Sequence, residues 1–282
     1  MKKPLCISIL CLSACALSAF AQQKVDNTLI NRAWTVGYGS ISLHDEYLSP
    51  LVYRGALYRA DYESMQFLST KTNKVSLQWF MSGAVSITNN PAGNNSILYG
   101  AVSPGIGLHY HFRPAKNLKI MVGGMWDILF ANKYSLSNGN NPYSVDLSTH
   151  WDVSAIAQYK LYIKKFPVML RYSASIPVVG VMFVPEYGAS YYEMFVLGNL
   201  KNAFHVASLN NNVAYNSSLT ADLMFTKWIV RLAYYHDYQK NSANSLHFET
   251  MQNAFSIGLV VNLAIFDRGK RRVPSTFSDV NE

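Results

Sequence analysis

LYGAVSPGIGLHYHF, residues 98–112, alternates between two kinds of side chain. The even positions are mostly apolar: Leu98, Val102, Ile106, Leu108, Tyr110 and Phe112. The odd positions are mostly polar or small, and they include Tyr99, Ser103, Gly105, Gly107, His109 and His111. Because successive side chains of a β-strand point to opposite faces, this stretch predicts a strand with one apolar and one polar face.

The same alternation recurs along the chain and predicts ten strands. The least regular candidate is residues 52–67, because its four charged residues do not all share one face. These residues are Arg54, Arg59, Asp61 and Glu63. The ten predicted strands are Ala33–His44, Val52–Phe67, Val75–Thr88, Leu98–Phe112, Leu118–Phe130, Trp151–Ile163, Phe166–Pro177, Ser218–Phe225, Trp228–Tyr238 and Asn253–Phe266.

The connections between these strands alternate in length. Four are short and carry lysine or arginine: residues 70–74, 113–117, 164–165 and 226–227. The others are longer and rich in Asn and Gly: residues 44–51, 89–96, 133–145, 178–217 and 239–252. Outer-membrane barrels have short periplasmic turns and longer external loops. The sequence therefore predicts an all-β, antiparallel up-and-down transmembrane β-barrel with both ends of the chain on the periplasmic side.

Two alternatives to a ten-stranded barrel are open. A soluble periplasmic β-sandwich would bury the apolar faces in a core, but the predicted strands of about 12–15 residues exceed the roughly 5–6 usual in soluble proteins. Tilted strands that cross a membrane need about 9–11 residues for the hydrocarbon alone. Residues 178–217 could add a hairpin, which would give twelve strands, or fold over the mouth of the barrel.

The first residues have the pattern of a signal peptide. Lys2 and Lys3 precede an uncharged, mostly apolar run from residue 4 to residue 20. Small residues at both peptidase recognition positions predict cleavage after Ala21. Lipidation at Cys15 is the alternative, because Leu-Ser-Ala-Cys resembles a lipoprotein box. We expect one barrel domain over residues 22–282, ending in a periplasmic tail at 267–282.

Composition limits the compartment and the partners. All three cysteines, Cys6, Cys11 and Cys15, lie in the leader, so a mature chain has no disulfide and no cysteine metal site. The net charge of +8 is spread along the chain rather than gathered in a basic block, which argues against nucleic acid. We expect an outer-membrane location, with membrane lipid, the barrel-assembly machinery and an unidentified external ligand as partners.

The last predicted strand carries a degenerate form of a barrel-assembly signal. Ser256, Gly258, Val261 and Leu263 have the expected spacing, but aromatic residues are usual at the last two positions.

Part of the chain resembles a known protein family. The residues that resemble the family's most characteristic stretch are Pro177–Gly180, Phe183, Pro185–Glu193 and Leu197–Asn199, and the similarity extends through Ser256–Gly258. This is a family of uncharacterised, signal-peptide-bearing proteins of Bacteroides-type bacteria, carried as a domain of unknown function. Its members often carry a histidine where this chain has residues 252–255, QNAF, which argues against a shared catalytic histidine. The resemblance implies an envelope protein and no particular activity.

The positions of the tight turns predict which polar and charged residues face each other inside the barrel. A tight turn at residues 226–227 sets Asp222 opposite Arg231, and the turn at 164–165 sets Gln158 opposite Arg171. Opposite charges on facing strands stabilise the register. In a narrow lumen these residues form a polar network, because barrels of about ten strands are usually filled by side chains. A selective pore lined by the same groups is the alternative.

A second set of candidates lies at the outer rim. It comprises His44, Asp45, Glu46, His236, Asp237, His247 and Glu249. Closure of the barrel could bring them together, and a histidine beside carboxylates can act as a general base, as in rim proteases of some ten-stranded outer-membrane barrels. His236 and Asp237 are neighbours on one strand and so face opposite ways, which argues against joint action. A solvated polar rim is the plainer interpretation.

The remaining residues give weaker indications of metal binding or catalysis. His109 and His111 share the inner face near Lys119, and we interpret them as hydrogen-bonded lumen residues, with metal binding as the alternative. No nucleophile elbow or phosphate-binding glycine loop is present, so we expect no cofactor. The chain is therefore expected to be a structural or surface-binding barrel rather than an enzyme. A rim hydrolase acting on peptide or lipid and a narrow channel are the alternatives.

Overall fold

The structure is a computed structural model that describes residues 29–68, 73–139, 141–225 and 228–264. The predicted cleavage after Ala21, the lipidation at Cys15, the tail at 267–282 and the turn at 226–227 lie outside these residues and stay predictions.

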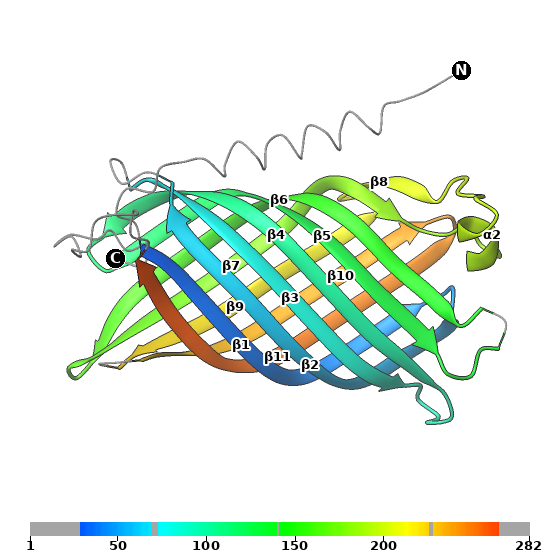
Figure 1. Cartoon of the computed structure of the whole chain (residues 1–282), viewed down its shortest axis with the longest axis horizontal. Helices are drawn as coiled ribbons and strands as arrows, with labels where there is room; N and C mark the ends of the chain where they lie inside the picture. Colours follow the sequence, from blue (N-terminus) through cyan, green and yellow to red (C-terminus); the bar gives the residue numbers. More distant parts are fainter. Residues whose placement is uncertain (1–28, 69–72, 140, 226–227, 265–282) are drawn as a thin grey trace, which may run out of the picture.

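The described strands form one closed antiparallel barrel (Figure 1). Each strand pairs with its neighbour in the chain, and the last strand returns to the first, with Leu29 opposite Ala264. The ten barrel strands are β1 (Leu29–Asp45), β2 (Ser49–Phe67), β3 (Val75–Asn89), β4 (Ser96–Ala115), β5 (Leu118–Ser135), β6 (Tyr143–Ile163), β7 (Phe166–Phe183), β9 (Asn212–Met224), β10 (Ile229–Ala243) and β11 (Leu246–Ala264). The closed barrel confirms the predicted fold and excludes the sandwich.

The apolar face of the alternating strands points outward. Val85 is 57% exposed, Trp151 62% and Phe255 73%. Polar residues such as His109 and Arg231 are buried inside. A soluble protein would cover so many large apolar side chains, whereas lipid is their ordinary surrounding in a membrane barrel. Among the described residues, no helix is long and apolar enough to cross a membrane.

The two ends of the barrel differ. At the turn end, β4 and β5 are joined by residues 116–117 and β6 and β7 by residues 164–165. At the loop end, the connections include residues 46–48, 90–95, 136–142 and 184–211. The first residues of β1 and the last of β11 lie together at the turn end, opposite β8 and α2 (Figure 1). The longer connections therefore lie at the predicted end, although residues 46–48 at that end are as short as a turn.

The prediction of a long loop at residues 239–252 is wrong. β10 and β11 continue through most of it and are joined by the two-residue turn Asn244-Ser245, with φ angles of 52° and 60°. Both residues are left-handed, as in a type I′ hairpin turn, which usually carries Asn-Gly. The alternation also reverses here, because Leu246 and Phe248 are apolar and buried inside. The predicted loop at 133–145 likewise shrinks to residues 136–142.

Residues 178–217 form neither a simple loop nor a hairpin of a twelve-stranded barrel. β7 pairs with β9 over Val168–Ser175 and then, over Val179–Phe183, with the extra strand β8 (Phe204–Ser208). The segment from 184 to 211, which we call the cap, contains β8 and the one-turn helix α2 (Tyr191–Phe195). The molecule is thus a ten-stranded barrel with one additional strand.

Strand β2 is more regular than its sequence suggested. Arg59, Asp61 and Glu63 share the inner face and line the lumen, while Arg54 lies on the outer face and is exposed. The four charged residues thus do not all share one face, as predicted, although Arg59, Asp61 and Glu63 occupy alternate positions and point the same way.

Candidate functional site

One carboxylate joins three strands across the lumen. Glu63 on β2 accepts hydrogen bonds from Arg171 on β7 at 2.6 and 2.9 Å and from Arg231 on β10 at 2.7 Å. Gln78 Nε2 donates to the same carboxylate at 2.6 Å. Because these side chains come from four strands, β2, β3, β7 and β10, their contacts fill the lumen at this level.

The predicted opposite pairs are present in the register. Asp222 lies opposite Arg231, and the two form bonds of 2.7 and 2.8 Å. Gln158 lies opposite Arg171. The Arg171 guanidinium, however, binds Glu63, a partner that turn arithmetic could not identify because the two residues are 108 positions apart.

A second ion cluster lies beside the first. Arg59 Nε donates to Asp61 at 2.8 Å, and Arg59 Nη1 donates to Asp237. The same guanidinium lies over the Tyr235 ring, 4.4 Å from its centroid. Asp237 therefore serves a lumen ion pair and is not available to a site at the rim.

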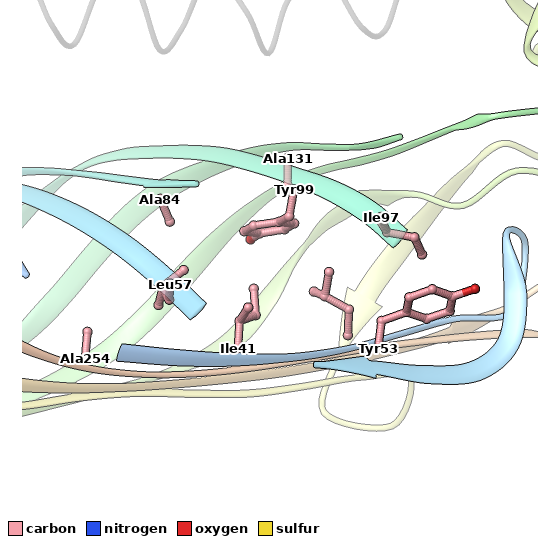
Figure 2. Close-up of a cluster of buried hydrophobic side chains, with 9 residues drawn as sticks. Ile41, Tyr53, Leu57, Ala84, Ile97, Tyr99, Ala131 and Ala254 are labelled. Atoms are coloured by element: carbon pink, nitrogen blue, oxygen red, sulfur yellow. The ribbon is translucent and has the colours of Figure 1, made fainter. Parts of the chain in front are cut away.

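The loop end of the lumen contains an apolar cluster and a buried lysine. Lys133 Nζ lies 3.0 Å from Asp45 and 2.7 Å from Asp146, and Ser144 donates to Asp45 at 2.7 Å. Figure 2 shows the apolar cluster, in which Tyr99 from one wall points toward Ile41 and Leu57 from the facing wall.

A third group of acidic residues faces a cavity of about 210 Å³ in the lumen. His150 Nδ1 lies 3.2 Å from Asp127 Oδ1, and Asn212 Nδ2 lies 2.8 Å from His150 Nε2. Asp152 lies two residues further along β6, beside an irregularity in the β6–β7 register, and lines the same cavity.

Closure of the barrel brings the rim candidates together in pairs rather than in one group. His247 Nδ1 lies 3.0 Å from Glu46, and its hydrogen bond lowers the Glu46 carboxyl pKa below the ordinary 4.5. His44 lies opposite Glu249 in the β1–β11 register, whereas Asp45 turns inward to Lys133. His236 is hydrogen-bonded to Asn253 at 2.8 Å.

The inner histidines are held apart from one another. His109 Nε2 lies 3.1 Å from Ser154, His111 Nε2 lies 2.8 Å from Ser76, and the His111 ring packs on Phe67 at 5.0 Å. Lys119 Nζ lies over the same Phe67 ring at 5.9 Å. Within the described ranges, no group of three His, Cys, Asp or Glu residues could hold a metal ion.

The cap is anchored to the barrel by two tyrosines. Tyr47 donates to the Ala189 carbonyl at 2.9 Å, and Tyr191 accepts from the Val145 amide at 2.6 Å. Burial raises the pKa of the Tyr47 hydroxyl to about 12. Met194 is buried against Phe183. These contacts hold the irregular segment in one place on the loop end.

Comparison with solved structures finds barrels of bacterial outer membranes. The outer membrane protease OmpT of Escherichia coli is 8% identical over 86% of this chain and 99% of its own, with a TM-score of 0.42. The transport unit of the Escherichia coli autotransporter AIDA-I is 8% identical over 87% and 92%, with a TM-score of 0.41. Ail of Yersinia pestis is 9% identical over 84% and 100%, with a TM-score of 0.29. No curated protein matches the chain.

The family comparison covers almost the whole sequence. The family described as "Protein of unknown function (DUF3316)" matches residues 4–271. The resemblance to a domain of unknown function is thereby confirmed, while the bacterial source and the leader stay predictions. The chain therefore belongs to the DUF3316 family, whose function is unknown.

Proposed function

We propose that this protein is an outer-membrane barrel with a closed lumen that binds a polypeptide partner through the exposed surface of its cap. The apolar outer face of the strands supports the membrane location, because an acyl environment is the one in which that face is favourable. The short basic turns and the longer opposite connections support an orientation with the cap outside the cell.

The filled lumen favours a surface role over a channel. Glu63 is bonded across the lumen to Arg171 and Arg231, and an apolar cluster packs inside the loop end. Aqueous channels are usual in barrels of about sixteen strands, whereas smaller ones are filled by side chains.

The rim geometry gives little support to hydrolysis. Asp237 is bound to Arg59 in the lumen, and His236 is bound to Asn253. The remaining rim pair, Glu46 and His247, is exposed to solvent and forms no further ion pair among the residues described.

The cap surface is the observation that carries the proposal. Phe195 is 60% exposed, Val196 66% and Leu197 65%, although Met194 beside them is buried and anchors the segment. Tyr187 and Tyr192 are also exposed. Large apolar side chains gathered on an ordered surface outside the lumen mark an interaction site.

A polypeptide fits this surface better than lipid. Aromatic side chains are enriched and charges depleted at the centres of protein interfaces. Residues 196–203 follow an irregular backbone, and irregular backbone does not face the acyl chains of a membrane.

Photo-crosslinking in living cells tests the binding role. A photoreactive residue at Leu200 is expected to give a protein adduct of one discrete mass, and Phe195→Ser should abolish that adduct. A matched photoreactive residue at Asn94, in another loop at the same end, should give none. Adducts that are absent, unaffected by Phe195→Ser or formed only with lipid would refute the cap as a protein-binding surface.

Thiol labelling tests the orientation separately. Single cysteines at Asn94 and Tyr187 should react with an impermeant reagent on intact cells, while cysteines at Lys116 and Lys165 should not. Equal labelling of both pairs contradicts the proposed orientation.

A further inference from the structure

The acidic group on β5 and β6 differs from the other acids in the lumen. Asp61 and Asp237 share Arg59, Glu63 and Asp222 share Arg231, and Asp45 and Asp146 share Lys133. Asp127 and Asp152, by contrast, form no ion pair with Lys or Arg within the described part of the chain. This wall of the cavity therefore has two carboxyl groups that no lysine or arginine of the described lumen pairs with.

His150 forms no hydrogen bond with Asp152. Its Nδ1 lies 3.2 Å from Asp127 Oδ1, and its Nε2 lies 2.8 Å from the side-chain amide of Asn212. Both ring nitrogens therefore have other partners, and the Asp152 carboxyl group is left with the Ser175 side chain.

Unpartnered acceptors face the same cavity. The Asp152 residue is 6% exposed, and its Oδ1 has no hydrogen-bond partner among the described residues, although the Ser175 side chain bonds to the carboxylate. Gln78 Oε1 and Thr220 Oγ1 are also buried without a partner in the part of the chain that the structure describes. All three side chains line the cavity of about 210 Å³.

We propose that this cavity binds a small organic cation bearing an ammonium or guanidinium group, with Asp152 as its counter-ion. An N–H donor with a positive charge satisfies the free Asp152 oxygen and neutralises the acidic wall, whereas water could satisfy only the hydrogen bond. Phe80 also lines the cavity, and an aromatic ring attracts a cation placed over its face. The described residues contain no three-ligand group for a metal ion.

The test uses agmatine, which carries both an amine and a guanidinium. It is titrated into the full processed protein, folded in detergent, by calorimetry and by thermal unfolding. We expect saturable binding that raises the melting temperature, and Asp152→Asn should weaken binding by about tenfold or more because it removes a charge-assisted bond. The control Glu249→Gln removes one negative charge from the outer face and should bind as the unaltered protein does.

Reduced migration of the unboiled protein in gels establishes that each variant is folded. Absence of agmatine binding to the unaltered protein, or equal binding to Asp152→Asn, overturns the proposal. So does an equal response to 1,4-butanediol, which lacks the charge, or a stronger response to Mg²⁺, which would indicate a metal site. If neither the unaltered protein nor Asp152→Asn binds agmatine, and Asp152→Asn is the more stable of the two, the carboxylate is only a destabilising group.

Discussion

Replacement of Glu63 by glutamine removes the charge that joins β2 to β7 and β10. The Glu63 carboxylate accepts four hydrogen bonds of 2.6–2.9 Å, three of them from Arg171 and Arg231, whose side chains are only 7% and 2% exposed. In the Glu63→Gln variant, the new side chain would present an amide N–H₂ to donors and leave the Arg171 guanidinium without a counter-charge.

The structure sets the size of the loss. Breaking a buried ion pair from one side costs about 3–5 kcal/mol. Because Arg231 keeps Asp222, we expect the lower end, about 3 kcal/mol of the free energy of unfolding. Urea titration of the protein in lipid vesicles, followed by tryptophan fluorescence and by gel migration of unboiled samples, measures this loss.

Two further variants separate charge from packing. Glu63→Met combined with Arg171→Met removes both members of one pair and should cost less than Glu63→Gln, because no buried charge is left alone. Glu249→Gln on the outer face should cost under about 1 kcal/mol. A loss for Glu63→Gln no larger than that of Glu249→Gln would refute the reasoning.

Three other changes test separate parts of the structure. Gly123→Val should prevent formation of the fast-migrating unboiled form, because its Cβ would overlap the backbone of β4; a normal folded band contradicts this. Tyr191→Phe removes the acceptor of the Val145 amide and should cost about 1 kcal/mol locally, seen as faster hydrogen exchange at that amide, whereas unchanged exchange would argue against the anchor. His247→Ala should raise the Glu46 pKa toward 4.5, measured by carboxyl NMR, and should remove the stabilisation that the pair contributes above that pH and loses as the pH falls through the lowered pKa; an unchanged titration speaks against the pair.

The barrel could be predicted from the sequence because lipid and lumen impose opposite polarity on alternate residues. That rule identified all ten strands and their pairing, including Asp222 with Arg231. It failed near the loop end, where the polarity reverses. Leu246 and Phe248 are apolar and point inward there, so the strands were predicted to end too early.

The interior contacts could be predicted only between strands joined by a tight turn. Such a turn fixes which residues are opposite, but Glu63 meets Arg231 from 168 positions away, and Lys133 meets Asp45 from 88. These contacts depend on the tilt and diameter of the closed barrel. A useful signal was present in Arg59, Asp61 and Glu63, because three charges at alternate positions of one strand indicate a polar inner face.

Tryptophan quenching by brominated lipid tests the outward direction of the apolar side chains most directly. The five tryptophans are at positions 34, 79, 126, 151 and 228, and four of them are 42–62% exposed, on the outside of the barrel. In vesicles of lipid brominated on its acyl chains, we expect most of the tryptophan fluorescence to be quenched, with little quenching by aqueous iodide. Strong iodide quenching with no effect of the brominated chains would contradict the account, because the same side chains would then face water.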